Sequence, residues 1–254
     1  MIKFFLKIPL LKRLIPSLGI RISKLFNKNR GYYNIKSIIF YLDFLDPVDR
    51  QIILNKEYEQ DAVNFLENEM RKNFFSNFLD IGANSGYYSF YFAKKFSDLK
   101  IQAFEPNADA YNKFLKTILK NSFKNVEILN FGLSNINNKV KMITWFKHGI
   151  AKTNSIILEK SHDMRNSKIF EANLRIGDEI INISDKKIVL KIDVEGHELS
   201  VLDGLKSILN KNKSLILIEI ADEKFEKVNK FLCEKNFRII FKSKYRLDYV
   251  YSNL

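Results

Sequence analysis

The stretch that decides the fold covers residues 80–87 and reads Asp-Ile-Gly-Ala-Asn-Ser-Gly-Tyr. It follows the short apolar run Phe78–Ile81 and leads into the amphipathic run Tyr87–Phe96, so it predicts a turn between a strand and a helix. Glycines in such a turn let the backbone bend tightly and approach a ligand closely. Because ligands bind open α/β sheets at the carboxyl ends of the strands, the stretch predicts a ligand site there.

Strand-like and helix-like runs alternate on both sides of this turn. The alternation predicts an α/β fold in which a parallel sheet is covered by helices on both faces. Residues 134–182 interrupt the pattern and are expected to hold an inserted hairpin and loop. The expected strands are 78–81, 101–104, 126–131, 188–192 and 215–220, with a closing hairpin of 237–241 and 247–251, and the expected helices are 87–96, 108–119, 198–209 and 223–234.

Length and composition limit the classes of protein that the chain can form. It has 254 residues, of which 46% are hydrophobic, enough for one large domain with a short appendage, and this excludes a disordered chain. The single cysteine, Cys233, excludes a disulfide framework and cysteine-ligated metal centres. These features indicate a protein of a reducing compartment, and we expect a cytoplasmic location.

Basic residues are concentrated in the first thirty residues, which carry eight lysines and arginines and no acid out of a net charge of +13. Lysines interrupt the apolar runs of this arm, which excludes a membrane-spanning helix. Its apolar residues recur at helical spacing, and Pro16 is expected to divide it into two short helices. The arm is either an amphipathic helix on an anionic membrane surface or a helix packed on the domain with a solvated basic face.

Two acidic residues indicate the cofactor. Asp80 lies in the mouth of a Gly-x-x-x-Gly loop, where it would repel the pyrophosphate of a dinucleotide but attract a cationic amino-acid tail. Glu105 ends the second strand of the alternating part, where an acid can accept hydrogen bonds from ribose hydroxyls. S-adenosylmethionine, an adenosine with a positively charged tail, satisfies both acids.

Four motifs in this order resemble the FkbM family of S-adenosylmethionine-dependent methyltransferases: residues 80–89 (DIGANSGYYS), 103–107 (AFEPN), 130–134 (NFGLS) and 190–198 (LKIDVEGHE). The resemblance covers roughly residues 55–252 and starts with Tyr58-Glu59; Gly132 stands where the family usually has alanine. It implies a seven-stranded Rossmann-like methyltransferase sheet with helices on both faces. The expected divisions are a basic amphipathic arm at 1–30, a helical lead-in at 31–76 and the FkbM-type domain at 77–254. The candidate cofactor-binding residues are Asp80, Gly82, Asn84, Gly86, Glu105, Gly132 and Leu133.

The candidate catalytic residues crowd the end of strand 188–192 and are Lys191, Asp193, Glu195 and His197. A lysine in a buried strand needs a partner, and Glu219 on the neighbouring strand is the expected one unless Lys191 faces the substrate. His197 is a candidate general base because its pKa lies near neutrality, and Glu195 is a candidate for substrate contact. No metal site is assigned, although Asp193, Glu195 and either Glu219 or Asp222 offer oxygen ligands that suit magnesium.

The resemblance implies O-methylation of a sugar or a secondary metabolite, and the basic arm adds a lipid-linked glycan as a candidate acceptor. RNA ribose methylation and a non-catalytic, membrane-anchored protein are the alternatives. Nucleic acid is not the expected partner, because no two prolines are adjacent and DNA amino-methyltransferases use an Asn/Asp-Pro-Pro-aromatic loop. The variable residues 140–182, with Trp145, Phe146, His148 and Phe170, are expected to shape the acceptor pocket, and the basic arm is expected to hold the enzyme to the cytoplasmic face of the membrane.

Overall fold

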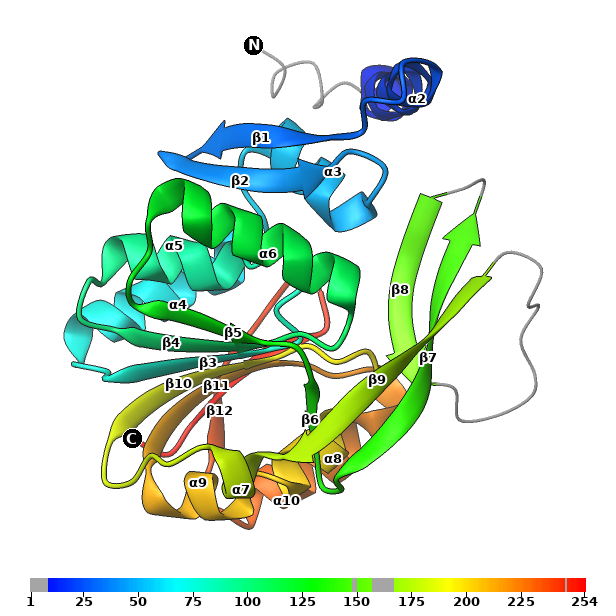
Figure 1. Ribbon diagram of the computed structural model, residues 1–254. Helices are drawn as coiled ribbons and strands as arrows, with labels where there is room; N and C mark the ends of the chain where they lie inside the picture. Colours follow the sequence, from blue (N-terminus) through cyan, green and yellow to red (C-terminus); the bar gives the residue numbers. More distant parts are fainter. Residues whose placement is uncertain (1–8, 148–149, 157–166, 245) are drawn as a thin grey trace.

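The computed structural model describes residues 9–147, 150–156, 167–244 and 246–254. A seven-stranded sheet forms its centre (Figure 1). Strand β13 runs antiparallel to β11 and β12, and the other neighbouring pairs of this sheet run parallel. In spatial order the strands are β12 (Arg238–Lys242), β13 (Asp248–Ser252), β11 (Lys213–Glu219), β10 (Lys187–Ile192), β3 (Asn77–Ile81), β4 (Lys100–Phe104) and β5 (Val126–Leu129).

Helices cover both faces of this sheet, as expected (Figure 1). Successive strand residues point to opposite faces, so Phe78 joins the core on one face and Leu79 joins the core on the other. The first face carries α4 (Gln60–Lys72), α5 (Tyr87–Lys95) and α6 (Ala108–Asn121), and the second carries α8 (Glu198–Asp203), α9 (Lys206–Lys211) and α10 (Phe225–Cys233), which follows the short 3-10 helix η2 (Asp222–Lys224).

The order of the strands creates a crevice beside β3. The chain passes from β3 outward to β4 and β5 and then returns to β10 on the other side of β3. The direction of progression therefore reverses between β3 and β10. In open α/β sheets this reversal point is where ligands bind, outside the carboxyl ends of the strands.

The interruption after β5 forms a second, four-stranded sheet in the order β6-β9-β7-β8. It is larger than the expected hairpin and loop, and the expected strand 126–131 ends at Leu129, before the chain enters this sheet. The expected hairpin is present as the antiparallel pair β7–β8, with β9 on the other side of β7. The four strands are β6 (Gly132–Ser134), β7 (Asn138–Lys147), β8 (Ile150–Ile156) and β9 (Ser167–Ile176), followed by the short helix α7 (Gly177–Ile180).

The lead-in at 31–76, which was expected to be helical, also contains a hairpin. Residues 30–43 form an antiparallel hairpin of β1 (Arg30–Ile35) and β2 (Ile38–Asp43), and helix α3 (Pro47–Asn55) follows before α4. The two turn residues, Lys36 and Ser37, both have positive φ, of 50° and 64°. Such a two-residue turn matches the right-handed twist of the paired strands.

Two helix boundaries also differ from expectation. Helix α2 (Pro9–Leu25) continues through Pro16, so the arm is not divided into two short helices. The expected helix 198–209 is divided at Gly204, where an added Cβ would lie 1.9 Å from the carbonyl oxygen of Ser134. Contact with β6 therefore fixes this break. Among the described residues, no helix is both long and apolar enough to cross a membrane.

Candidate active site

A cavity of about 780 Å³ lies at the carboxyl ends of β3, β4, β10 and β11, at the reversal point of the main sheet. The glycine loop after β3 and the end of β10 form two of its walls. Phe170, Met142 and Leu174 of the second sheet line it as well, so the segment that is expected to shape the acceptor pocket contributes a wall of this cavity. The side chains of Trp145 and Phe146 and the whole of His148 lie outside the described residues.

The loop between β3 and α5 requires its two glycines. Gly82 has a φ of 78°, and a Cβ there would lie 1.9 Å from the carbonyl oxygen of Asp193. Gly86 has a φ of 77°, and its Cβ would lie 2.4 Å from the ring of Phe114. Asn84 between them also has a positive φ, of 49°. The loop therefore turns in the left-handed region and brings bare backbone to the edge of the cavity.

Glu105 follows β4 and faces this loop. Its Oε2 accepts a hydrogen bond from the amide of Asn84, and its Oε1 accepts one from the amide of Asn107, both at 2.8 Å. Only 5% of Glu105 is exposed, and this burial raises the pKa of its carboxyl above the ordinary value. Because each carboxylate oxygen has a further lone pair, Glu105 can also accept hydrogen bonds from a ligand in the cavity.

Asp80 lies behind the loop and is not among the residues that line the cavity, so its direct contact with the ammonium tail of a cofactor stays a prediction. Its side chain is fully buried and accepts hydrogen bonds from the amide and hydroxyl of Ser89, at 3.2 and 2.6 Å. Burial raises its pKa, and nearby Lys191 opposes that effect. Asp80 therefore anchors the first turn of α5 and stabilises the loop from within.

Gly132 and Leu133 begin β6 and line the cavity beside Glu105. A Cβ on Gly132 would lie 2.9 Å from Leu174 and 3.6 Å from Pro106, so alanine here requires a small shift of Leu174. Leu133 is 1% exposed and belongs to the core under the sheet. These residues give the Glu105 side of the cavity an apolar wall.

The four candidate catalytic residues come together at the end of β10, and all four line the cavity. The expected Lys191–Glu219 ion pair is wrong: Lys191 Nζ lies 3.0 Å from Asp193 Oδ2 and donates to the carbonyl oxygen of Gly82 at 3.1 Å. Burial opposes ionisation of both groups. Their mutual attraction outweighs it, raising the pKa of Lys191 and holding that of Asp193 below its usual range.

Glu195 and His197 have different surroundings. Burial, with the charges of Asp193 and Glu198, raises the pKa of Glu195 to about 7. His197 Nε2 lies 2.9 Å from the hydroxyl oxygen of Ser134, and burial together with the charge of Lys224 lowers the pKa of the imidazole. Both groups can therefore exist uncharged near neutral pH.

The family model of the methyltransferase FkbM domain matches residues 80–239, which span the glycine loop, Glu105 and the end of β10. The chain belongs to the FkbM methyltransferase family. A hexuronic acid methyltransferase, AglP of Haloferax volcanii, is 27% identical over 167 residues, which is 64% of this chain and 62% of that relative's length.

Solved structures also resemble the chain. A putative caffeoyl-CoA O-methyltransferase from Staphylococcus aureus aligns over 94% of this chain and 98% of its own, with 12% identity and a TM-score of 0.47. A precorrin-6y C5,15-methyltransferase from Geobacter metallireducens aligns over 77% and 88%, with 12% identity and a TM-score of 0.46.

S-adenosylmethionine is the methyl donor of the FkbM family, and the cavity fits it. Glu105 would hold the ribose hydroxyls, the bare backbone of residues 82–86 would lie against the amino-acid tail, and Gly132 and Leu133 would lie against the adenine. The bound cofactor supplies an electrophilic methyl group on a sulfonium. The residues that line the cavity would orient the cofactor beside its acceptor.

Arg246, a residue that the sequence patterns did not predict at the site, lies in the loop between β12 and β13 and lines the cavity. Its Nη2 lies 2.6 Å from Glu59 and 3.7 Å from Glu219, and its Nε lies 2.9 Å from Asp248. The guanidinium also lies over the ring of Tyr58, 5.7 Å from its centre. Arg246 thereby joins the lead-in to the end of β11. The sequence signal for Arg246 is weak, because nothing in the spacing relates residue 246 to residue 59.

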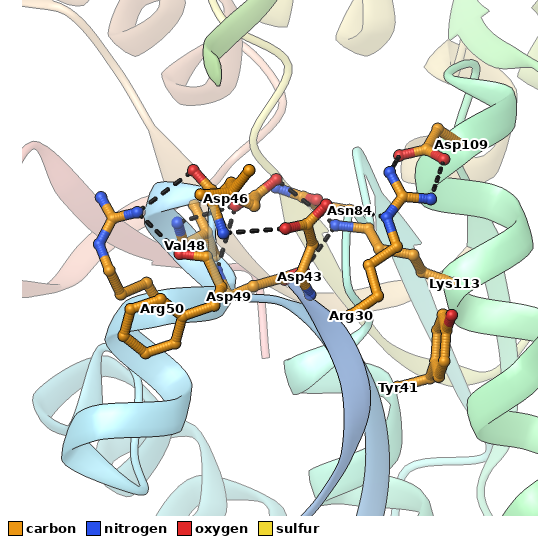
Figure 2. Close-up of polar contacts among 12 residues, drawn as sticks. Arg30, Tyr41, Asp43, Asp46, Val48, Asp49, Arg50, Asn84, Asp109 and Lys113 are labelled. Atoms are coloured by element: carbon orange, nitrogen blue, oxygen red, sulfur yellow. Dashed lines mark hydrogen bonds and ion pairs between the residues drawn. The ribbon is translucent and has the colours of Figure 1, made fainter. Parts of the chain in front are cut away.

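Hairpin β1–β2 and the start of α3 form a further wall of the cavity that the sequence did not predict. Figure 2 shows Arg30 and Asp43 beside Asn84 and Lys113. Arg30 donates through Nη1 and Nη2 to the carboxylate of Asp109, at 2.8 and 2.9 Å, and through Nε to Asp43 at 2.8 Å. The arginine therefore joins the first strand to the first turn of α6 at the rim of the cavity.

A buried ion pair lies beneath this wall (Figure 2). Lys113 Nζ lies 2.6 Å from Asp49 Oδ2, and 4% and 0% of the two side chains are exposed. Asp49 Oδ2 also accepts a hydrogen bond from the amide of Asp43 at 2.9 Å. Burial raises the pKa of Asp49 to about 6, with the charge of Lys113 opposing it. The pair fixes α3 against α6.

Within the described residues, no group of three or more His, Cys, Asp or Glu side chains is arranged to hold a metal ion. The alternative of a magnesium ion held by Asp193, Glu195 and Glu219 or Asp222 therefore receives no support. Asp222 is exposed and stands outside the cavity lining.

Proposed function

We propose that the chain transfers a methyl group from S-adenosylmethionine to a hydroxyl oxygen of a sugar or glycan. One observation carries the proposal: a single cavity joins the glycine loop and Glu105 on one side to a group of ionisable side chains at the ends of β10 and β11 on the other. Methyl transfer needs a donor and an acceptor held in line within one site, with a group nearby that takes the proton.

The acceptor end of the cavity is polar, which suits a hydroxylated acceptor. Lys191, Asp193, Glu195 and His197 offer charged and hydrogen-bonding groups there, and the aromatic ring of Phe170 lies on the opposite sheet. Sugars present both hydroxyl groups and apolar ring faces, and this combination can match both walls. The hexuronic acid named in the Haloferax volcanii relative supports a sugar acceptor.

To test this, the full chain is incubated with methyl-labelled S-adenosylmethionine and one of three acceptors: a neutral methyl hexoside, a methyl hexuronide or an RNA transcript. The label transferred to each acceptor is measured. We expect label in a glycoside, S-adenosylhomocysteine in equal amount, and a mass gain of one methylene unit on an oxygen. Label in the RNA instead would favour a ribose methyltransferase. Cofactor binding without transfer to any of the three would favour a non-catalytic protein.

We also propose that the arm binds the anionic surface of the cytoplasmic leaflet, where a lipid-linked glycan would be within reach. The exposed fractions of Leu14, Leu18, Ile22 and Leu25 are 51%, 59%, 48% and 79%, and these residues recur along one side of α2. Gly19, on another side, packs against Phe44, since its Cβ would lie 2.7 Å from that ring. The helix thus contacts its own domain without covering its apolar stripe, and the arm's bases favour anionic lipid.

Co-sedimentation with vesicles tests the role of the arm. The full chain should pellet with vesicles rich in anionic lipid and much less with neutral ones. The Leu14→Ser/Leu18→Ser/Ile22→Ser variant should lose this binding, whereas Leu119→Ser, at an even more exposed leucine of α6, should keep it. Equal pelleting of the triple variant and the unaltered chain would contradict a lipid-binding arm.

A further inference from the structure

We propose that Glu219 receives the proton of the acceptor hydroxyl, as one half of a hydrogen-bonded carboxyl pair with Asp193. This inference rests on the proposed methyl transfer to oxygen. It assigns Glu219, which sequence analysis considered only as a partner of Lys191 or a metal ligand, to the catalytic centre.

The sheet register places the two carboxyl groups side by side. Ile192 of β10 pairs with Ile218 of β11 in parallel, so Asp193 and Glu219 directly follow paired positions at the same edge of the sheet. Their side chains share a hydrogen bond, and both line the cavity. The exposed fractions of the Asp193 and Glu219 side chains are 23% and 34%, so Glu219 is the more open of the two to a bound acceptor.

The charged groups around the pair decide which carboxyl keeps the shared proton. Lys191 lies against Asp193, at 3.0 Å, and holds it ionised. On the other side, Arg246 lies 3.7 Å from Glu219 but is closer to Glu59 and Asp248, at 2.6 and 2.9 Å. Glu219 therefore lies near two negative charges, those of Asp193 and Asp248. The nearby cation, Arg246, is paired more closely with other carboxylates.

This arrangement makes Glu219 a stronger base than an ordinary carboxylate. Burial, followed by the charge of Asp193, raises the pKa of Glu219 to about 8. A base with a pKa near the working pH is the most effective in general base catalysis. Asp193 and Lys191 are thus positioning residues for Glu219: Lys191 keeps Asp193 ionised, and the charge of Asp193 raises the pKa of Glu219.

The step balances without a further reactant. The acceptor oxygen forms its bond to the methyl carbon while the carbon–sulfur bond breaks and its electron pair stays on sulfur. The hydroxyl proton passes to the carboxylate of Glu219, which later returns it to water. His197 is less well placed for this task, since Ser134 occupies its Nε2 and Lys224 disfavours its protonated form.

The carboxyl pair can be tested without any acceptor. In the full chain labelled with ¹³C at the glutamate δ-carbons, one signal should titrate near pH 8 and disappear in Glu219→Gln. In Asp193→Asn the same signal should titrate at lower pH, because the neighbouring negative charge is gone. Ordinary glutamates titrate below about pH 6. If the signal that disappears in Glu219→Gln titrates below that pH in the unaltered chain, the carboxyl pair is overturned.

Turnover of whichever methyl glycoside is methylated tests the catalytic role. Glu219→Gln should lower kcat about 10²–10⁴-fold with little change in cofactor affinity, and should remove the rise of kcat with pH toward 8. Glu226→Gln, at an exposed position of α10, is the matched control, and His197→Gln should cost less than about tenfold. Near-normal kcat in Glu219→Gln would overturn the role of Glu219 and leave the methyl transfer standing. If none of the glycosides is methylated, the proposed function is overturned. The titration of the labelled glutamates would still decide whether Asp193 and Glu219 form a carboxyl pair.

Discussion

Arg30 and Asp109 form a doubly hydrogen-bonded ion pair, with Nη1 and Nη2 of the arginine 2.8 and 2.9 Å from the two carboxylate oxygens. The pair joins the start of β1 to the first turn of α6, and both residues line the cavity. A segment that precedes the family-matched region therefore contributes a wall of this cavity.

Replacing Arg30 by alanine should weaken cofactor binding measurably while the fold stays intact. The side chains of Arg30 and Asp109 are 40% and 52% exposed, so solvent screens the pair and stability should fall by no more than about 1 kcal/mol. Calorimetric titration with S-adenosylhomocysteine should show an affinity loss of about fivefold, because the wall beside Asn84 loosens. Arg238→Ala, at an exposed site on β12, is the control. Equal affinity in Arg30→Ala and the control would show that this wall is not needed.

The buried pair of Lys113 and Asp49 should behave in the opposite way. Lys113→Met leaves a fully buried carboxylate without its cation, and the free energy of unfolding should fall by about 3–5 kcal/mol. Adding Asp49→Asn should recover part of the loss, since the remaining side chain is uncharged. Denaturant unfolding of the single and double variants measures both effects. A loss below about 1 kcal/mol in Lys113→Met, the range of an exposed pair, would contradict a buried ion pair.

Much of this architecture follows from local patterns. Successive residues of the strand 78–81 point to opposite faces, and Phe78 and Leu79 lie in opposite cores. The glycine loop and Glu105 at the next strand end predict the edge of the sheet where the cavity lies, because both signals lie within a few residues of sequence. The clustering of Lys191, Asp193, Glu195 and His197 follows from the same rule, since they end one strand.

The rest depends on contacts between distant segments. Arg30 meets Asp109, and Arg246 meets Glu59, through packing that no local spacing encodes. The β1–β2 hairpin was missed because its turn, Lys36-Ser37, lacks the asparagine or glycine usual at positive φ. The break at Gly204 is set by β6, about seventy residues earlier in the chain. Lys191 pairs with Asp193 on its own strand end, so the partner expected from the neighbouring strand was wrong.

Stability should fall with rising pH because of Glu195 and Glu219. In the folded chain their pKa values are raised to about 7 and about 8, above the values they have when unfolded. The folded state therefore binds more protons than the unfolded state between about pH 4 and 8, and its stability declines across that range. Glu195→Gln/Glu219→Gln should flatten the decline in denaturant unfolding at pH 5 and pH 8.5. An unchanged slope in the double variant would contradict the raised pKa values.

Calorimetric titration of the cofactor tests most directly whether Glu105 holds its ribose. S-adenosylhomocysteine should be titrated by calorimetry into the unaltered chain, into Glu105→Gln and into Glu127→Gln, an exposed control on β5. We predict that Glu105→Gln weakens binding by about 1–3 kcal/mol, since it removes charge-assisted hydrogen bonds to the ribose, and that Glu127→Gln binds normally. Equal affinity in all three proteins would contradict the assignment of the cofactor site to the ends of β3 and β4.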